Sequence, residues 1–359
     1  MFGRDALDSR PIPTFIHAIQ APLSVKSTDF TVRNATILAT GSYAPANVIE
    51  NKWFNELLGE DVDTWLRENV QIERRHWCAA AESTADLAEA AASRALANAG
   101  LPPEAVDLLL VATDTPEFIS PSTASVVQDR LQLKNAGTFD LNTACAGFVT
   151  ALDVAVKYIR ADEQYGHVLV VGAYAMSKYL QLHDKKTVTL FADGAGAVVV
   201  GPCAAGKGFL GSKLRTQGEY NGWMGIYAGG THEPVTPEVL ERHGHQLQFV
   251  HKFPKTLNPE IWTQMAGTLC AKNNISPTDI DHYFITQINI NSIWETMDRL
   301  GVPRERAATI MHEYGYTGSA CIPMAFDQWT QQGKVKPGDK VLFIGSGGGL
   351  AFGAALFEL

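Results

Sequence analysis

The sequence lacks the features that mark several common classes of protein. Its five cysteines are an odd number, and no two have metal-ligand spacing, which disfavours structural disulfides and zinc. No apolar run is long enough to span a membrane. Acidic residues (38) outnumber basic ones (29), and the resulting net charge of -9 disfavours nucleic acid as a partner. We therefore expect a reduced, cytoplasmic protein without a metal, a membrane anchor or a nucleic-acid partner.

The length and composition favour a large core. The chain has 359 residues, 46% of them hydrophobic. Residues 1–29 are polar and lack the apolar core of a signal peptide, so we expect an N-terminal extension there. The apolar runs 106–112 and 167–172 predict buried strands, and the alanine-rich stretch 83–99, ended by Gly100, predicts a helix.

The second part of the chain repeats the first. Residues 103–107 resemble residues 277–281, and both stretches precede an apolar strand. Residues 147–172 resemble residues 318–345 in the same way. Two matches in the same order predict two similar α/β halves, residues 30–205 and 206–359, related by a pseudo-twofold axis.

The stretch around Cys145 has the pattern of a nucleophile. Residues 140–148 predict a strand, a tight turn and the start of a helix, and only small residues flank the cysteine. The positive end of a helix dipole favours the thiolate over the thiol, and small neighbours let a substrate approach. The alternative is a buried cysteine that only packs.

The repeat also predicts which residues share a pocket with Cys145. Aligning Gly147 with Gly318 places Tyr316 opposite Cys145, and Thr286 follows the strand 283–285. We therefore expect Cys145, Thr286 and Tyr316 to converge between the two halves, where ligand sites often lie.

Four motifs together resemble the ketoacyl-acyl-carrier-protein synthase III (KAS III) family of the thiolase superfamily. They are residues 121–124, 142–148, 193–197 and 345–349, and the resemblance runs from about residue 30 to the C-terminus. It implies a five-layered αβαβα fold, a homodimer built on the first half, and acyl transfer from CoA or an acyl-carrier protein (ACP) to Cys145. It implies no cofactor beyond the phosphopantetheine thioester that carries the substrate.

The resemblance fails at two positions of the family's Cys-His-Asn triad. The family's His-Gln-x-Asn motif reads Thr-Gln-Ile-Asn at residues 286–289, and its Gly-Asn-Thr-Ser motif has Tyr316 in place of the asparagine. Threonine and tyrosine hydroxyls donate hydrogen bonds, but neither is a cation or a base near neutral pH. Because the amide of Cys145 and one amide of Gly347, Gly348 or Gly349 are expected to form the oxyanion hole, we expect self-acylation to survive better than malonyl condensation.

The resemblance suggests further binding and catalytic residues. His251 is a candidate replacement for the missing base. Glu117, in a loop that reaches the partner's pocket in this family, is either a cross-subunit base or a solvated carboxylate. Trp65 takes the place of the tryptophan that stacks on the CoA adenine. A basic patch for CoA, or else ordinary surface charge, is formed by Lys185 with Arg67, Arg74, Arg75 and Lys186.

The sequence thus predicts a 3-oxoacyl-ACP synthase III-like acyltransferase, of the class that moves acyl groups other than aminoacyl groups. An acyl-enzyme on Cys145 would be followed by a divergent condensation or by transfer to a non-standard acceptor, in fatty-acid or secondary metabolism. The alternatives are a non-catalytic partner subunit of a ketosynthase-like complex and a thioesterase-like hydrolase.

Overall fold

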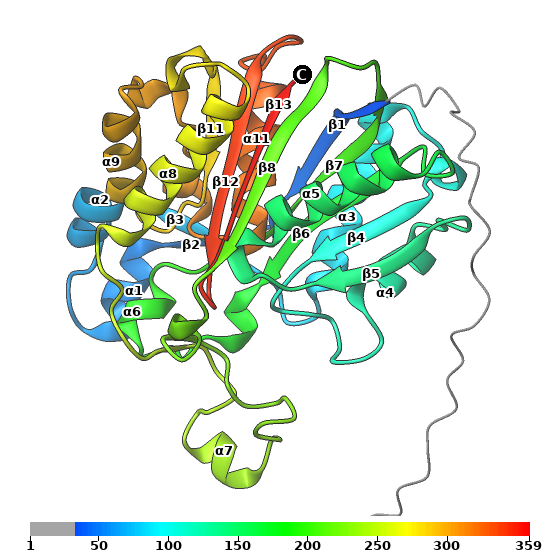
Figure 1. Ribbon diagram of the computed structural model, residues 1–359. Helices are drawn as coiled ribbons and strands as arrows, with labels where there is room; N and C mark the ends of the chain where they lie inside the picture. The colour runs from blue at the N-terminus through cyan, green and yellow to red at the C-terminus, as the bar shows by residue number, and fades with distance from the viewer. Residues whose placement is uncertain (1–32) are drawn as a thin grey trace, which may run out of the picture. The chain divides into compact units, whose positions relative to one another are not determined.

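The computed structural model describes residues 33–359, so the predicted N-terminal extension lies outside the described residues. The described chain forms two main sheets with helices on their faces (Figure 1). No helix in this part of the chain is long and apolar enough to cross a membrane.

The first sheet has five strands in the order β1-β7-β6-β4-β5. They are β1 (Asn34–Tyr43), β7 (Asp193–Cys203), β6 (Val168–Ala175), β4 (Leu108–Ala112) and β5 (Gly137–Leu141). The apolar strands β4 and β6 are parallel and wholly buried, as expected for strands covered on both faces. Helix α3 (Thr84–Ala99) packs on the outer face, begins with a capping box at Ser83 and ends at Gly100.

The second sheet has four strands in the order β11-β12-β13-β8. They are β11 (His282–Ile285), β12 (Lys340–Gly347), β13 (Ala351–Glu358) and β8 (Gly208–Thr216). Helix α8 (Leu257–Lys272) packs on the outer face of this sheet, and α9 (Ile290–Leu300) packs on α8.

A central layer of two helices lies between the sheets. Helix α5 (Gly147–Ala161) contacts β4 and β6 on one side and β12 and β13 on the other, and α11 (Cys321–Gln331) contacts β1 and β7 as well as β11. The close approach of α11 requires Gly196, since a Cβ there would collide with the backbone of Pro323 and Met324. The alternation of helix and sheet layers confirms the predicted five-layered thiolase-like fold.

The repeated stretches make matching hydrogen bonds in the two sheets. The backbone N–H of Asp107 donates to His167 and that of Asp281 donates to Lys340, both at 2.9 Å. The Asp107 carboxylate accepts from the N–H of Gly166 at 2.7 Å, and the Asp281 carboxylate accepts from the N–H of Lys340 at 2.8 Å. The division into halves at residue 205 remains our proposal; each sheet lies within one of them.

The remaining elements connect these layers. They are β2 (Asn47–Glu50), α1 (Asn51–Leu58), α2 (Asp63–Val70), β3 (Arg74–Trp77), α4 (Thr123–Arg130), α6 (Lys185–Val188), β9 (Met224–Gly225), α7 (Pro237–Glu241), β10 (Gln248–Phe249) and α10 (Met311–Tyr314). In Figure 1 the segment that carries α7 extends away from the sheets, although residues just before and after it line the site described below.

Candidate active site

Cys145 lies in a short 3₁₀ turn, Ala144–Ala146, between strand β5 and helix α5. The residue is buried, and it lines two cavities. The larger cavity has a volume of about 210 Å³ and the smaller one about 90 Å³. The thiol therefore lies where the two cavities adjoin.

Tyr316 is the predicted partner that the structure brings to Cys145. Both residues line the smaller cavity, and the Tyr316 hydroxyl lowers the pKa of the Cys145 thiol. Its backbone is fixed by two hydrogen bonds of 2.9 Å, from its N–H to Leu190 and from the N–H of Ala192 to its carbonyl. Its ring centroid lies 5.3 Å from that of Phe191. A catalytic role for Tyr316 stays a prediction.

The alignment that led to Tyr316 is wrong in register. The two central helices begin at Gly147 and Cys321, and each follows a 3₁₀ turn, Ala144–Ala146 or Gly318–Ala320. Gly318 therefore corresponds to Ala144 rather than to Gly147. Tyr316 precedes the second turn and contacts Cys145 through its long side chain.

The pKa of the Cys145 thiol is shifted in the direction opposite to the predicted preference for a thiolate. Burial raises the pKa of the Cys145 thiol well above its usual range, and the negative charge of Asp114 raises it further. The Tyr316 hydroxyl lowers the pKa, but burial has the larger effect. Burial raises the pKa of Tyr316 too, so its hydroxyl keeps its proton near neutral pH.

Thr286 is buried at the end of β11 and lines neither cavity. Its hydroxyl oxygen accepts a hydrogen bond of 2.9 Å from the N–H of Ser346 and makes a longer contact of 3.5 Å with the Ser346 carbonyl. Asn289 lines neither cavity and instead caps helix α9, accepting from the N–H of Asn291 at 3.0 Å. Both polar side chains therefore accept hydrogen bonds from nearby backbone N–H groups, of Ser346 and Asn291, rather than facing Cys145.

The glycines 347–349 lie where the oxyanion loop was predicted. Gly347 ends β12 so close to the turn that a Cβ on it would collide with the Cys145 nitrogen and the Thr143 carbonyl. Gly348 and Gly349 line the larger cavity. This places glycine backbone beside the nucleophile; its function as an oxyanion hole stays a prediction.

Sequence reasoning missed Asp114, which lines the larger cavity just beyond the end of β4. Its Oδ1 is buried without a hydrogen-bond partner, and burial raises the pKa of this carboxyl to about 6. A signal was present, because this acidic residue lies two positions after a wholly apolar strand that pairs with the strand leading to Cys145. The other side chains of this cavity include Asn142, Tyr174, Met176, Phe191, Asn221, Met224, Ile226, Tyr227 and Leu247.

The other two proposed bases do not reach the cavities at Cys145. His251 is exposed, and its ring packs against that of Trp223 with centroids 5.4 Å apart. Glu117 accepts a hydrogen bond of 2.9 Å from the N–H of Ala85 and so caps the start of α3. Within one chain, neither residue is placed to act on a substrate at Cys145.

Trp65 and Lys185, the predicted CoA contacts, lie together at a separate cavity of about 390 Å³. Trp65 is 54% exposed, which leaves its ring available for stacking. Lys186 and Glu60 also line this cavity, and Lys185 pairs with Glu60 at 2.9 Å.

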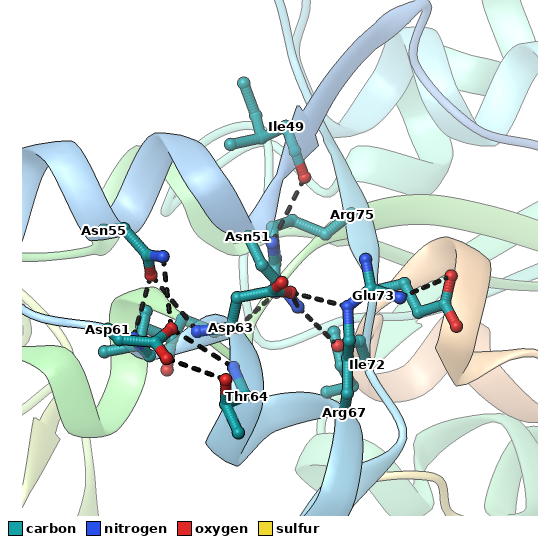
Figure 2. A network of polar contacts seen from close by, with 12 residues as sticks. Ile49, Asn51, Asn55, Asp61, Asp63, Thr64, Arg67, Ile72, Glu73 and Arg75 are labelled. Atoms are coloured by element: carbon teal, nitrogen blue, oxygen red, sulfur yellow. Dashed lines mark hydrogen bonds and ion pairs between the residues drawn. The ribbon is translucent and has the colours of Figure 1, made fainter.

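The predicted basic patch is smaller than expected, because its arginines are engaged elsewhere. Figure 2 shows Arg67 paired with Asp63 at 2.8 Å and the Arg75 side chain directed to Asn51, which it contacts at 2.7 Å. Arg75 is buried, and Arg74 pairs with Glu313. The lysines of α6 therefore remain as the cations of this cavity.

Comparison with known proteins decides the family. The family model of 3-oxoacyl-[acyl-carrier-protein (ACP)] synthase III matches residues 139–218. The model of the C-terminal part of the same family matches residues 270–359. A beta-ketoacyl-[acyl-carrier-protein] synthase III from Clostridium perfringens (strain SM101 / Type A) is 36% identical over 334 residues, which cover 91% of this chain and 100% of the relative. The chain belongs to the 3-oxoacyl-ACP synthase III family.

Solved structures of this family have the same fold. The 3-oxoacyl-[acyl-carrier-protein] synthase III from Aquifex aeolicus VF5 has a TM-score of 0.81 at 30% identity, covering 90% of this chain and 100% of that one. The priming beta-ketosynthase of the R1128 polyketide pathway has a TM-score of 0.84 at 28% identity, covering 91% and 96%. The KAS III-like architecture thus extends over most of the chain.

Proposed function

We propose that this protein is an acyltransferase that forms an acyl-enzyme on Cys145 from an acyl-CoA or acyl-ACP. The observation that carries the proposal is the position of the buried thiol between two cavities, with the Tyr316 hydroxyl and the Gly347 backbone beside it. The names of the relatives support a thioester donor of this kind. The cavity at Trp65 and Lys185 is our proposed contact for CoA.

The first step needs only groups that surround Cys145. The sulfur attacks the thioester carbonyl, a new C–S bond forms, the bond to the carrier sulfur breaks, and the thiol proton leaves with the carrier thiol. The Tyr316 hydroxyl favours this step because it lowers the pKa of the Cys145 thiol. Backbone N–H groups of Cys145 and the glycines 347–349 are proposed to hold the oxyanion.

The second step is proposed to differ from ordinary malonyl condensation. Among residues 33–359, neither cavity at Cys145 is lined by a histidine, lysine or arginine. The Thr286 hydroxyl accepts a hydrogen bond from the N–H of Ser346, and the Tyr316 hydroxyl is neutral near neutral pH because burial raises its pKa. Losing one oxyanion donor typically costs about 10²–10³ in rate. We therefore propose a divergent condensation or transfer to a non-standard acceptor, in fatty-acid or secondary metabolism.

Intact-protein mass spectrometry with a panel of acyl-CoAs and acyl-ACPs tests the first step. We expect the mass of one acyl group on the unmodified protein and on Cys203→Ala, which removes a half-buried thiol far along the chain from the site. Cys145→Ala should gain no acyl group. An acyl group on another residue, with Cys145→Ala still loaded, would refute the assignment.

Release of carbon dioxide from malonyl-ACP tests the second step. We expect little or none from protein that self-acylates normally, and turnover equal to that of a standard family member would overturn the divergent step. Steady release of free acid would instead identify a thioesterase-like hydrolase. Absence of loading across the whole panel would favour a non-catalytic partner subunit.

A further inference from the structure

The backbone around Asp114 is fixed at the wall of the larger cavity. The N–H of Thr113 donates to the Leu141 carbonyl at 3.1 Å, and the Thr115 hydroxyl accepts from the N–H of Ala175 at 2.9 Å. Hydrogen bonds on both sides of Asp114 thus join it to β5, the strand that leads to Cys145, and to β6. The backbone of Asp114 is therefore held at the wall of the cavity.

Among the described residues, the Asp114 Oδ1 is the one fully buried side-chain oxygen or nitrogen of this cavity that has no hydrogen-bond partner. The described residues place no cationic side chain in the cavity. By contrast, Asn142 accepts from the N–H of Ala144 at 2.9 Å, and the Tyr227 hydroxyl donates to the Asn221 carbonyl at 3.2 Å. Buried carboxylates are normally paired, because losing hydration without a partner is costly.

The acyl group on Cys145 fits the larger cavity better than the smaller one. The smaller cavity holds about 90 Å³ and is bounded by the rings of Phe249, Phe253 and Tyr316. The larger holds about 210 Å³ and contains Asp114 at its wall. The charge of Asp114 raises the pKa of the Cys145 and Tyr174 side chains, which shows that the carboxylate lies near both.

We propose that Asp114 binds a hydrogen-bond donor carried by the acyl group, so that the substrates are short acyl thioesters bearing a hydroxyl or an ammonium group. This inference rests on the proposed function, because the acyl group must first be attached to Cys145. A donor on the acyl chain would supply the partner that the carboxylate lacks. A site built around a buried acceptor also rejects an isostere without the donor, since the acceptor would then stay unpaired.

Three thioesters with the same branched skeleton test the proposal: 3-hydroxybutyryl-CoA, 3-aminobutyryl-CoA and isovaleryl-CoA. Their β-carbons carry a hydroxyl, an ammonium and a methyl group, and acetyl-CoA serves as a loading control. The initial rate of Cys145 acylation is measured by intact mass. We expect the unmodified protein to load at least one donor-bearing group about tenfold or more faster than isovaleryl. The ammonium and hydroxyl arms distinguish the two sources of the donor.

Variants of Asp114 complete the test. Asp114→Val should remove the preference or reverse it toward isovaleryl, while Asp114→Asn should keep a preference for hydroxyl over methyl because its amide oxygen still accepts. Equal loading of all three groups, or faster loading of isovaleryl by the unmodified protein, would overturn the inference while leaving the acyl-enzyme intact. Failure of every thioester, acetyl-CoA included, would refute the proposed function itself. The comparison within the unmodified protein remains decisive if a variant does not fold.

Discussion

Two neighbours act on the Cys145 thiol in opposite directions. The Tyr316 hydroxyl lowers the pKa of the thiol, whereas the negative charge of Asp114 raises it. Tyr316→Phe should therefore slow alkylation of Cys145 by iodoacetamide at a fixed pH, and Asp114→Asn should accelerate it. One pKa unit corresponds to about a tenfold change in thiolate population. Rates measured from pH 6 to 9, by mass spectrometry of the Cys145 peptide, check both directions.

Tyr227→Phe is the matched control for this experiment. Tyr227 lines the same cavity, but its hydroxyl bonds to the Asn221 backbone rather than to the thiol. Its alkylation rate should stay close to that of the unmodified protein. Parallel changes in all three variants would show that access to the cavity, and not the thiol pKa, controls the reaction.

Asp114 also makes the stability of the protein depend on pH. Its pKa is raised from an ordinary 3.8 to about 6, so the folded state holds this proton more tightly than the unfolded state. The free energy of unfolding should fall as pH rises through this window, because the buried carboxyl must ionise. Asp114→Asn should therefore be more stable above pH 6, by up to about 3 kcal/mol, and the difference should vanish below pH 4. Thermal denaturation at several pH values measures it.

The exposed Asp129, changed to Asn, provides the control for that measurement. This variant makes the same chemical change at a side chain that is exposed to solvent, so it controls for the substitution itself. If the difference in free energy of unfolding between Asp114→Asn and the unmodified protein does not change with pH, the burial of an unpaired charge at Asp114 is contradicted.

At this scale the sequence locates some site residues and misses others. Cys145 and the glycines 347–349 are found because small residues around a nucleophile make a local pattern. The hydrogen bond between Thr286 and Ser346 is not predicted, because Ser346 is distant in the chain and is brought close by the pairing of β11 with β12. Asp114 is missed for a related reason: whether a carboxylate is paired depends on tertiary contacts that no local motif encodes.

At the level of elements, the position of the nucleophile turn, Ala144–Ala146, depends on its close contact with β12. A Cβ at Gly347 would collide with the Cys145 nitrogen, so Gly347→Ala should displace the turn. We expect acylation to fall by about 10²-fold or more, since displacement of a reacting group by about 1 Å can cost that much. Acylation by intact mass, with the melting temperature measured in parallel, tests this.

The control is Gly267→Ala in helix α8, where a Cβ would meet nothing within 4 Å. Alanine favours a helix over glycine by about 1 kcal/mol, so this variant should acylate normally and be slightly more stable. Normal acylation by Gly347→Ala would show that the turn tolerates displacement.

The elements themselves are predictable to different degrees. The apolar runs become β4 and β6, and the capped alanine-rich stretch becomes α3, ending at Ala99 as expected. The charged stretch 61–77 gave no clear pattern, because α2 and β3 are too short for one and are held by side-chain contacts such as those of Asn51. Local patterns do not predict the strand order either, since the edge strand β1 pairs with β7, which is the last strand of the first sheet along the chain.

For the whole molecule, we predict a homodimer through the first half. The loop from Glu117 to Pro121 exposes Phe118 by 51% and Ile119 by 87%, an apolar surface that a partner would cover. Sedimentation at micromolar concentration should show a dimer that Ile119→Asp weakens. Val235→Asp, at a residue 52% exposed near α7, should leave the dimer unchanged. A monomeric unmodified protein would also remove any cross-subunit role for Glu117.

Asp107 and Asp281 occupy equivalent positions in the two repeated stretches and make the same kind of hydrogen bond. The carboxylate of each accepts a hydrogen bond from a backbone N–H at the start of the neighbouring strand, from His167 at 2.9 Å or from Lys340 at 2.8 Å, yet only the sheet of Asp107 also carries the nucleophile turn. Asp107→Asn and Asp281→Asn therefore make the same chemical change at equivalent positions of the two repeated stretches. Hydrogen exchange in each variant would show whether a local loss stays in its own copy or spreads to the other. The protein can thus report, without any external reference, how far its duplicated parts still behave as independent folding units.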